Sequence, residues 1–234
     1  MIGVSGSHGF IGSRLGERLT DWVALNRFGF VPTDVDCIYD LAVHGNLFGQ
    51  DKIDQIYEAN VVRVAKELMT GRNIKQFIFM STSSVTLPQQ TFYSLSKRAS
   101  EEMVRLWGKT NDCWAVIVRP YTVIGPGEYE GHLIPRLIDS CLNGTSMPFV
   151  PNATHDFIYV DDVVDALVLL KNINLQGVVE LGTGIKHTNK EVKELVEKIT
   201  GKKANITHTP KLRSYDTDNW VAKQSILTSC GWKP

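Results

Sequence analysis

The chain has 234 residues, of which 43% are hydrophobic and 21% are charged, and this is ordinary globular composition. Twenty-five basic residues balance twenty-five acidic ones, whereas nucleic-acid-binding domains usually carry a basic excess, so no nucleic-acid partner is expected. The apolar stretches are shorter than the roughly 20 residues of a membrane span, and the first residues lack the pattern of a signal peptide. Four cysteines are scattered without a C-x-x-C pair, and no cluster has metal-ligand spacing. We therefore expect a soluble, reduced, cytoplasmic protein with neither a membrane partner nor a metal.

Strands and helices alternate along the first half of the chain. Short apolar runs predict strands at residues 1–5, 22–26, 36–42, 76–81 and 114–119. Apolar residues three or four positions apart predict helices at residues 10–20, 52–70 and 92–109. The apolar face of the helix at 52–70 consists of Tyr57, Val61, Val64 and Leu68. This alternation predicts an α/β protein with a parallel sheet that has helices on both faces.

After residue 119 the sequence pattern changes, and a glycine–proline loop follows at 125–127. The remaining predicted elements are a helix at 132–143, a strand at 156–160, a helix at 161–171 and a strand at 178–181. Thr188 then opens a last helix, because Glu191 three residues later completes a capping box.

A glycine-rich turn connects the first strand to the first helix. Its sequence is Gly6-Ser7-His8-Gly9-Phe10-Ile11-Gly12. Glycine lets the backbone approach a pyrophosphate closely, and the N-terminus of the following helix offers free N–H groups and partial positive charge. The position of the turn between a strand and a helix favours a dinucleotide phosphate site with residues 6–11 as contacts. The alternatives are a tight strand–helix turn and, for His8, a polar loop residue without a ligand.

Dinucleotide-binding proteins usually carry an acid for the ribose 2′-hydroxyl where this chain has Asn26, followed by Arg27. A missing carboxylate removes repulsion against a 2′-phosphate, and a guanidinium can bind one. The pair therefore favours NADP over NAD as the cofactor. The alternative is that Arg27 is a solvated loop charge.

Tyr93 and Lys97 lie four residues apart on a predicted helix and so share one face. A tyrosine with a pKa near 10 is a poor base, but a nearby ammonium favours the phenolate form. Such a pair can move a proton at a carbonyl or alcohol while a nicotinamide moves hydride. The preceding strand ends in a run of hydroxyl residues at 81–84, where ligands of open α/β sheets bind. The alternatives are a surface pair and a turn-forming hydroxyl cluster.

Several motifs occur together in order along the chain. They are Ser5-Gly6-x-x-Gly9-Phe10-Ile11-Gly12, Tyr39-Asp40-Leu41-Ala42, Asn60, the hydroxyl-rich strand end, Tyr93-x-x-x-Lys97, Arg119-Pro120, Gly125-Pro126-Gly127, Asp156-Phe157-Ile158-Tyr159-Val160-Asp161-Asp162, Leu181-Gly182-Thr183-Gly184 and Gly231-Trp232-x-Pro234. With them the whole chain resembles the extended short-chain dehydrogenases/reductases, the NAD(P)-dependent epimerase/dehydratase family. The resemblance implies a Rossmann-type doubly wound parallel sheet with a small C-terminal substrate lobe. The dinucleotide-binding core is expected at 1–124 and the mostly substrate-binding lobe at 125–234, with elements of 156–181 returning partly to the core.

The resemblance also implies roles for individual residues. Tyr93 is expected to be the general acid/base, Lys97 to bind the ribose, and Thr82 to orient the reacting oxygen. The other implied cofactor contacts are Leu41, Ala42, Val43, Asn60, Pro120 and Val123. The implied substrate contacts are His44, Thr82, Ser83, Thr122 and His155. Members of the family often pair through helices equivalent to 52–70 and 92–109, so a homodimer is expected.

Departures from the family pattern bear on the substrate. Thr122 stands where nucleotide-sugar enzymes often carry Asn, and His155 stands where the family usually has Arg, which weakens the case for a diphosphate site there. Two serines follow Thr82 in place of the Asp-Glu of enzymes that eliminate water, so a 4,6-dehydratase is not favoured. The segment between 26 and 36 is too short for a strand–helix unit, which predicts a more open adenine side.

These patterns predict an NAD(P)-dependent oxidoreductase or epimerase that acts on a hydroxyl or keto carbon of a sugar or nucleotide sugar through Thr82, Tyr93 and Lys97. Reduction and epimerisation use the same residues, so the sequence does not separate them. A non-catalytic NAD(P)-sensing protein and a reductase of a non-sugar carbonyl are the alternatives.

Overall fold

The computed structural model of the protein describes residues 1–47, 49–71, 73–210, 217, 219–223 and 225–234. Its centre is a six-stranded sheet in which the strands pair in parallel. In spatial order the strands are β10 (Gly177–Leu181), β5 (Trp114–Pro120), β4 (Gln76–Met80), β3 (Cys37–Asp40), β1 (Ile2–Ser5) and β2 (Trp22–Ala24). The parallel sheet that the alternating sequence pattern predicts is therefore confirmed.

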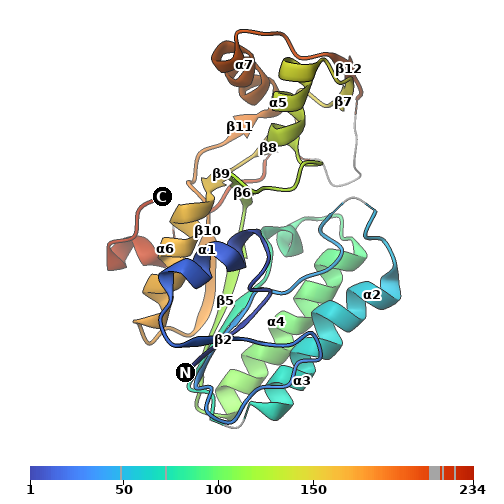
Figure 1. Cartoon of the computed structure of the whole chain (residues 1–234). Helices are drawn as coiled ribbons and strands as arrows, with labels where there is room; N and C mark the ends of the chain where they lie inside the picture. Colours follow the sequence, from blue (N-terminus) through green and yellow to red (C-terminus); the bar gives the residue numbers. More distant parts are fainter. Residues whose placement is uncertain (48, 72, 211–216, 218, 224) are drawn as a thin grey trace.

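Helices cover both faces of this sheet (Figure 1). The helices on one face are α1 (Phe10–Arg18) and α6 (Val160–Lys171), and those on the other are α2 (Ile53–Tyr57), α3 (Arg63–Thr70) and α4 (Phe92–Thr110). Neighbouring strand residues point to opposite faces, so Tyr39 shares a core with Leu15 of α1, whereas Ile38 shares a core with Val64 of α3. Strands buried on both sides explain the continuous apolar runs in the sequence. The Rossmann-type doubly wound architecture is confirmed.

The strand order places a topological switch point between β1 and β3. The chain leaves β1 towards β2 on one side and later returns to β3 on the other side of β1. In open α/β sheets, ligands bind at such a point, in the crevice outside the carboxyl ends of the strands. The glycine turn follows β1 and residues 41–44 follow β3, so both segments border this crevice.

The long helix predicted at 52–70 is interrupted by a π-helical turn, η1 (Glu58–Val62), which lies between α2 and α3. The predicted apolar face is only partly correct, because Val64 and Leu68 are buried while its two earlier members are half-buried. Polar side chains occupy much of the buried face, namely Asn60, Arg63 and Glu67. Hydrophobic spacing alone does not predict them, because their burial depends on partners from other elements.

Residues 25–36, all of which the structure describes, join β2 to β3 without a helix or strand. This segment lies against α3, where the Thr70 hydroxyl oxygen is 3.1 Å from the carbonyl oxygen of Gly29 and accepts the N–H of Val31 at 3.2 Å. Val31 and Val35 are buried in the core that α3 covers. The short crossing therefore contributes apolar side chains to the core.

A smaller lobe stands beyond the carboxyl edge of the sheet (Figure 1). It has its own apolar core, built from α5 (Leu133–Asn143), β7 (Met147–Phe149), α7 (Asn189–Thr200) and β12 (Ile206–His208). Two further strand pairs are β6 (Thr122–Ile124) with β9 (Phe157–Tyr159), and β8 (Thr154–His155) with β11 (His187–Thr188). The predicted capping box of Thr188 and Glu191 is present at the start of α7. Within the residues described, no helix is both long and apolar enough to cross a membrane.

Candidate active site

The glycine turn leads directly into α1 and is shaped by steric limits. Gly6 has a φ of 69°, and a Cβ there would lie 2.7 Å from the backbone nitrogen of Ala42. A Cβ on Gly12 would overlap the carbonyl oxygen of Gly6, so both positions require glycine. Gly9 is the N-cap of α1 and has no side chain to occupy the N–H groups of the first turn. Those groups are available to an anion.

The other predicted residues of the turn differ in exposure. Ser7 is buried, and its hydroxyl lies 3.2 Å from Nδ1 of His8, whose side chain is exposed. Phe10 and Ile11 begin α1 and are half-buried. The structure therefore keeps these four residues together at the start of α1, with His8 facing solvent.

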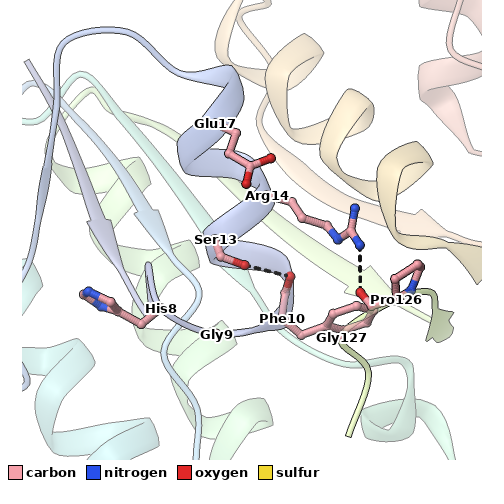
Figure 2. A pocket seen from close by; sticks show the side chains of 8 residues that line it. All are labelled: His8, Gly9, Phe10, Ser13, Arg14, Glu17, Pro126 and Gly127. Atoms are coloured by element: carbon pink, nitrogen blue, oxygen red, sulfur yellow. Dashed lines mark hydrogen bonds between the residues drawn. The ribbon is translucent and has the colours of Figure 1, made fainter. Parts of the chain in front are cut away.

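A cavity of about 330 Å³ lies beside the start of α1 (Figure 2). Its lining residues are His8, Gly9, Phe10, Ser13, Arg14, Glu17, Pro126 and Gly127. Figure 2 shows Arg14 reaching from α1 to the loop at 125–127, where it donates to the carbonyl oxygen of Pro126 at 2.7 Å. Arg14 also contacts Asp161 of α6 at 3.0 Å. One arginine thus joins the glycine turn to the loop that follows β6.

Residues 41–43 follow β3 and face the glycine turn. Leu41 is buried, Ala42 is half-buried and Val43 is exposed. The N–H of Leu41 donates to the carbonyl oxygen of Ser5 at 3.2 Å, so β1 and β3 stay joined up to the crevice. The close approach of Gly6 to Ala42 makes these two segments the opposite walls of the crevice.

Asn60 connects the segment after β3 to α4. Its side-chain amide donates to the carbonyl oxygen of His44 at 2.8 Å and to the hydroxyl of Ser96 at 2.9 Å. Its side-chain oxygen accepts the N–H of His44 at 2.9 Å. Asn60 is completely buried in the π-turn, and His44 is half-buried above it. The structure thereby places His44 close to the helix that carries Tyr93 and Lys97.

Tyr93 and Lys97 lie one turn apart at the start of α4. A capping box between Thr91 and Ser94 fixes the first turn of this helix. Tyr93 is half-buried, whereas Lys97 has only 1% of its surface exposed. The Lys97 ammonium has no hydrogen-bond partner in the part of the chain that the structure describes. Burial lowers the pKa of Lys97 to about 8, although the negative charge of Asp40 opposes this fall.

Thr82 and Ser83 follow β4 and begin a short 3₁₀ helix, η2 (Ser83–Thr86), that packs against α4. Thr82 is half-buried, and its hydroxyl accepts the N–H of Ser84 at 3.2 Å and lies 3.0 Å from the Ser84 hydroxyl. Ser83 has 1% of its surface exposed. The structure therefore places Ser83 inside the protein and leaves Thr82 partly open beside the helix of Tyr93.

The later motifs meet at Asp156, which is completely buried. Pro120 ends β5 and Val123 lies in β6, and between them the N–H of Thr122 donates to the carbonyl oxygen of Asp156 at 3.0 Å. The Asp156 carboxylate accepts the N–H and hydroxyl of Thr183 at 2.8 and 2.7 Å. It also accepts N–H groups from residues 184 and 222. Asp156 therefore ties the strand end after β5, through its backbone carbonyl, to the loop after β10, through its carboxylate.

Thr122 and His155, both predicted substrate contacts, lie together. The Thr122 hydroxyl is 3.1 Å from Nδ1 of His155. The buried imidazole contacts the rings of Phe157 and Trp220, with centroid distances of 5.5 and 5.6 Å. A hydroxyl and an imidazole thus stand where the family often has an amide and a guanidinium, and two aromatic rings flank the imidazole.

Asn26 and Arg27 lie after β2, at the sheet edge. The Asn26 side chain accepts the N–H of Phe28 at 2.9 Å, which shapes a turn. Arg27 is exposed, and its guanidinium carbon lies 5.0 Å from the centre of the Phe28 ring. Arg27 therefore forms part of the outer surface. Its loop is distant in the sequence from Lys97.

Sequence reasoning missed a set of buried charged residues beneath the site. They are Asp40, Arg63, Glu67 and Glu101. Glu101 accepts the hydroxyl of Ser81 at 2.5 Å and both Nε and Nη2 of Arg119, at 2.9 and 2.5 Å. The sequence did contain a signal for buried ion pairs. Glu67 follows Arg63 by four residues, and Glu101 follows Lys97 by four residues, so the members of each pair share one helix face. Among the described residues, no group of three or more His, Cys, Asp or Glu side chains is placed to hold a metal ion.

The fold and its crevice define a Rossmann-type α/β protein. A sequence model described as the NAD dependent epimerase/dehydratase family matches residues 18–182, which is more than half of the chain. The chain therefore belongs to this family. The matched region begins at the end of α1 and closes just after β10, so it contains every strand of the six-stranded sheet except β1.

Known proteins agree with this assignment. The low-salt glycan biosynthesis protein Agl12 of Haloferax volcanii is 27% identical over 186 residues, which is 78% of this chain and 57% of that protein. The chain thus spans a little more than half the length of this curated relative. A UDP-N-acetylglucosamine 4-epimerase from Methanobrevibacter ruminantium M1, in complex with UDP-N-acetylmuramic acid, has a TM-score of 0.89 at 21% identity, covering 100% of this chain and 92% of its own. MoeE5 in complex with UDP-glucuronic acid and NAD has a TM-score of 0.87 at 20% identity, covering 99% and 93%. At these identities the structural likeness establishes the fold.

Proposed function

We propose that the protein is an NAD(P)-dependent oxidoreductase or epimerase that acts on a hydroxyl or keto carbon of a sugar or nucleotide sugar. One observation carries the proposal: Tyr93 and Lys97 lie one turn apart on α4, and the buried Lys97 ammonium has no hydrogen-bond partner in the described part of the chain. A buried ammonium without hydrogen bonds is costly, and ribose hydroxyls are the acceptors that it lacks. Membership of the family, and the UDP sugars bound by similar structures, support the substrate class.

Two features of the crevice suit a dinucleotide. The first turn of α1 presents N–H groups beside Gly6 and Gly12, where any side chain would clash with the backbone of Ala42 or Gly6 and so displace the turn. Across the switch point, residues 41–43 form a wall that a nicotinamide ribose can follow towards Lys97. Proposed cofactor contacts are therefore the glycine turn, this wall and the Tyr93–Lys97 pair.

A bound nicotinamide supplies the ring that gives or takes a hydride. The Tyr93 hydroxyl exchanges a proton with the reacting oxygen of the substrate, and the Lys97 ammonium stabilises negative charge on the phenolic oxygen. The Thr82 hydroxyl holds the same substrate oxygen by a hydrogen bond. Oxidation or reduction uses this set once, and epimerisation uses it twice.

Cofactor choice depends on Arg27, and NADP is the favoured cofactor in this proposal. No carboxylate stands at Asn26 to repel a 2′-phosphate, and the exposed Arg27 guanidinium is free to approach one. Fluorescence titration should give a lower Kd for NADPH than for NADH, and Arg27→Ala should weaken NADPH binding alone. Equal effects on both dinucleotides would favour NAD, the cofactor bound in the MoeE5 structure.

A homodimer and a cytoplasmic location belong to the same proposal. Met69 of α3 and Leu106 of α4 are 80% and 64% exposed, and other exposed apolar residues are Ile53 of α2, Val62 of η1 and Leu95 of α4. Contiguous exposed apolar surface commonly marks an interface. The four cysteines are unpaired, which suits a reducing compartment. Light scattering of wild type and of the Met69→Glu, Leu106→Glu variant tests the dimer.

Tyr93→Phe tests the catalytic assignment. The phenyl ring preserves the packing but has no proton to exchange, so turnover of a panel of nucleotide sugars should fall by at least about a hundredfold. Binding of the dinucleotide should persist, and this serves as the control for folding. Turnover at the wild-type rate in the Tyr93→Phe variant would refute the role of Tyr93 as the proton donor and acceptor. Tight dinucleotide binding without turnover of any sugar in wild type would support the sensing alternative.

A further inference from the structure

Arg63 is a buried arginine whose five N–H donors all have acceptors. Its side chain is 4% exposed and extends from α3 towards the carboxyl ends of β1 and β3. The acceptors are the Ala59 carbonyl oxygen at 3.0 Å from Nε, Glu67 and Ser5 at 2.6 and 3.3 Å from Nη1, and Asp40 and the Ala42 carbonyl oxygen at 2.7 and 3.1 Å from Nη2. One guanidinium therefore connects the π-turn, α3 and the two strands that border the crevice.

The cluster closes a ring of contacts around the crevice wall. The Ser5 hydroxyl donates to the Asp40 carboxylate at 2.7 Å and accepts the Ala42 N–H at 3.4 Å. Arg63 holds the carbonyl oxygen of the same Ala42. Buried side chains thereby hold both the N–H and the carbonyl oxygen of Ala42, the residue that lies against Gly6. Three residues earlier on the helix, Asn60 fixes the next part of the wall.

Stability alone is a poor explanation for this arrangement. Asp40 and Glu67 are completely buried, and each has one oxygen without a hydrogen-bond partner in the described part of the chain. Buried ion groups of this kind are often no more stabilising than apolar side chains of the same volume. The flanking Val64 and Leu68 show that α3 can supply such side chains. Asp40, Arg63 and Glu67, here called the charged trio, instead lie where the backbone of β3 leaves the sheet to form the crevice wall at residues 41–43.

The trio also surrounds the candidate catalytic lysine with charge. The charged groups that act on Lys97 are Asp40 of β3, Arg63 and Glu67 of α3, and Glu101 of its own helix. Asp40 and the two glutamates favour the ammonium form, and Arg63 opposes it. A change at Arg63 therefore reaches the crevice through both the position of Ala42 and the field at Lys97.

We propose that Arg63 is a positioning residue that sets the width of the cofactor crevice, by fixing the Ala42 carbonyl and the end of β3 opposite the glycine turn. This inference rests on the proposed function, because it concerns how tightly a dinucleotide binds. Loss of Arg63 is expected to leave Ala42 free to move away from Gly6 and so to loosen the site.

Two variants separate positioning from folding. Arg63→Lys keeps the positive charge, but an ammonium does not offer five donors in a planar fork and so cannot hold the Asp40, Glu67 and Ala42 oxygens together. The combined variant Asp40→Asn, Arg63→Met, Glu67→Gln removes all three charges, so no unpaired ion is left in the core. Arg18→Met is the matched control, because Arg18 pairs with Asp165 at 2.8 Å on the exposed surface of α1.

The readouts are thermal unfolding, the Kd for NADPH and NADH by fluorescence, and KM measured separately for dinucleotide and sugar substrate. In the folded variants the dinucleotide Kd and KM should rise about tenfold while the KM for the sugar stays unchanged. Arg18→Met should bind as wild type does. Wild-type affinity in either folded variant overturns the inference, and so does loss of folding in both, since Arg63 then acts on stability alone. A wild-type chain that binds no dinucleotide would instead refute the proposed function, and this result is distinct from the others.

Discussion

The ammonium nitrogen of Lys97 lies 4.2 Å from the centre of the Phe79 ring. Phe79 belongs to β4 and Lys97 to α4, so a strand residue lies directly beneath the candidate catalytic lysine. The electron-rich ring face attracts a cation and replaces part of the lost hydration. Phe79 therefore helps to keep Lys97 charged in an interior where burial lowers its pKa to about 8.

Replacement of this ring should lower the pKa of Lys97 further. Phe79→Leu keeps an apolar side chain but removes the ring face, so the pKa should fall by roughly one pH unit. A carbon-13 NMR titration of the lysine Cε signals, assigned with Lys97→Met, measures it. Phe77→Leu on the same strand is the control, because the Phe77 ring packs against Trp107. Equal pKa values in the two variants would contradict the role of the ring.

The buried lysine should make stability depend on pH in a defined direction. The pKa of Lys97 is about 8 in the folded chain, whereas the ordinary value for a lysine, taken for the unfolded chain, is 10.5. Between pH 8 and pH 10.5 the unfolded chain therefore binds more protons than the folded chain. The cost of burying the ammonium is thus fully present below pH 8 and disappears as pH rises towards 10.5. The unfolding free energy of wild type, less that of Lys97→Met, should increase by about 3 kcal/mol across this window. Urea unfolding of the ligand-free protein at pH 7.5 and pH 10 measures the two differences, and a constant difference would refute the assignment.

Substitutions in the glycine turn should have graded effects. A Cβ on Gly12 would overlap the Gly6 carbonyl oxygen, whereas a Cβ on Gly9 would lie 3.2 Å from the same atom. Gly12→Ala should therefore displace the turn, abolish dinucleotide binding and lower the melting temperature. Gly9→Ala should leave the melting temperature close to that of wild type. Similar melting temperatures for the two variants would show that the turn is not as tightly packed as described.

Glu101 and Glu102 offer a test of buried against exposed ion pairs on one helix. Glu101 is 1% exposed and holds Arg119 and Ser81, whereas the side chain of Glu102 is 67% exposed and pairs with Arg105. Glu101→Gln should cost about 3 kcal/mol of unfolding free energy because it leaves Arg119 poorly compensated. Glu102→Gln should cost less than about 1 kcal/mol. Denaturant unfolding compares them, and equal costs would argue against a structural role for Glu101.

The parallel sheet was predictable because its strands are buried on both faces and therefore read as continuous apolar runs. The runs around Val4, Ile38 and Ile78 each coincide with a strand of the sheet. The strand predicted at 156–160 coincides with β9, but the other two- and three-residue strands outside the main sheet were not predictable. Segments as short as β8 and β11 have no room for an alternating pattern, and their pairing depends on neighbours that are distant in the chain.

The candidate site likewise contains residues that were predictable from the sequence and residues that were not. The positions of the glycine turn and of Tyr93 and Lys97 were predictable because each depends on local spacing within its own strand–helix unit. Arg63 was not, because its role depends on Asp40 and Ala42 of another element. Hydrophobic periodicity treats such a residue as solvated, and only the three-dimensional pairing reveals why it is buried.

The pairing of β10 with β5 has a consequence for synthesis of the chain. β5 ends at Pro120, but its outer neighbour is complete only at Leu181. At roughly 5–20 residues per second, a ribosome needs about 3–12 s to make the intervening segment. Throughout this interval the backbone edge of β5 is unpaired, and its side chains Val116 and Val118 belong to a core that still lacks the residues of α6 and β10. A nascent chain stalled in this window exposes an apolar strand edge to chaperones and to other unfinished copies of itself.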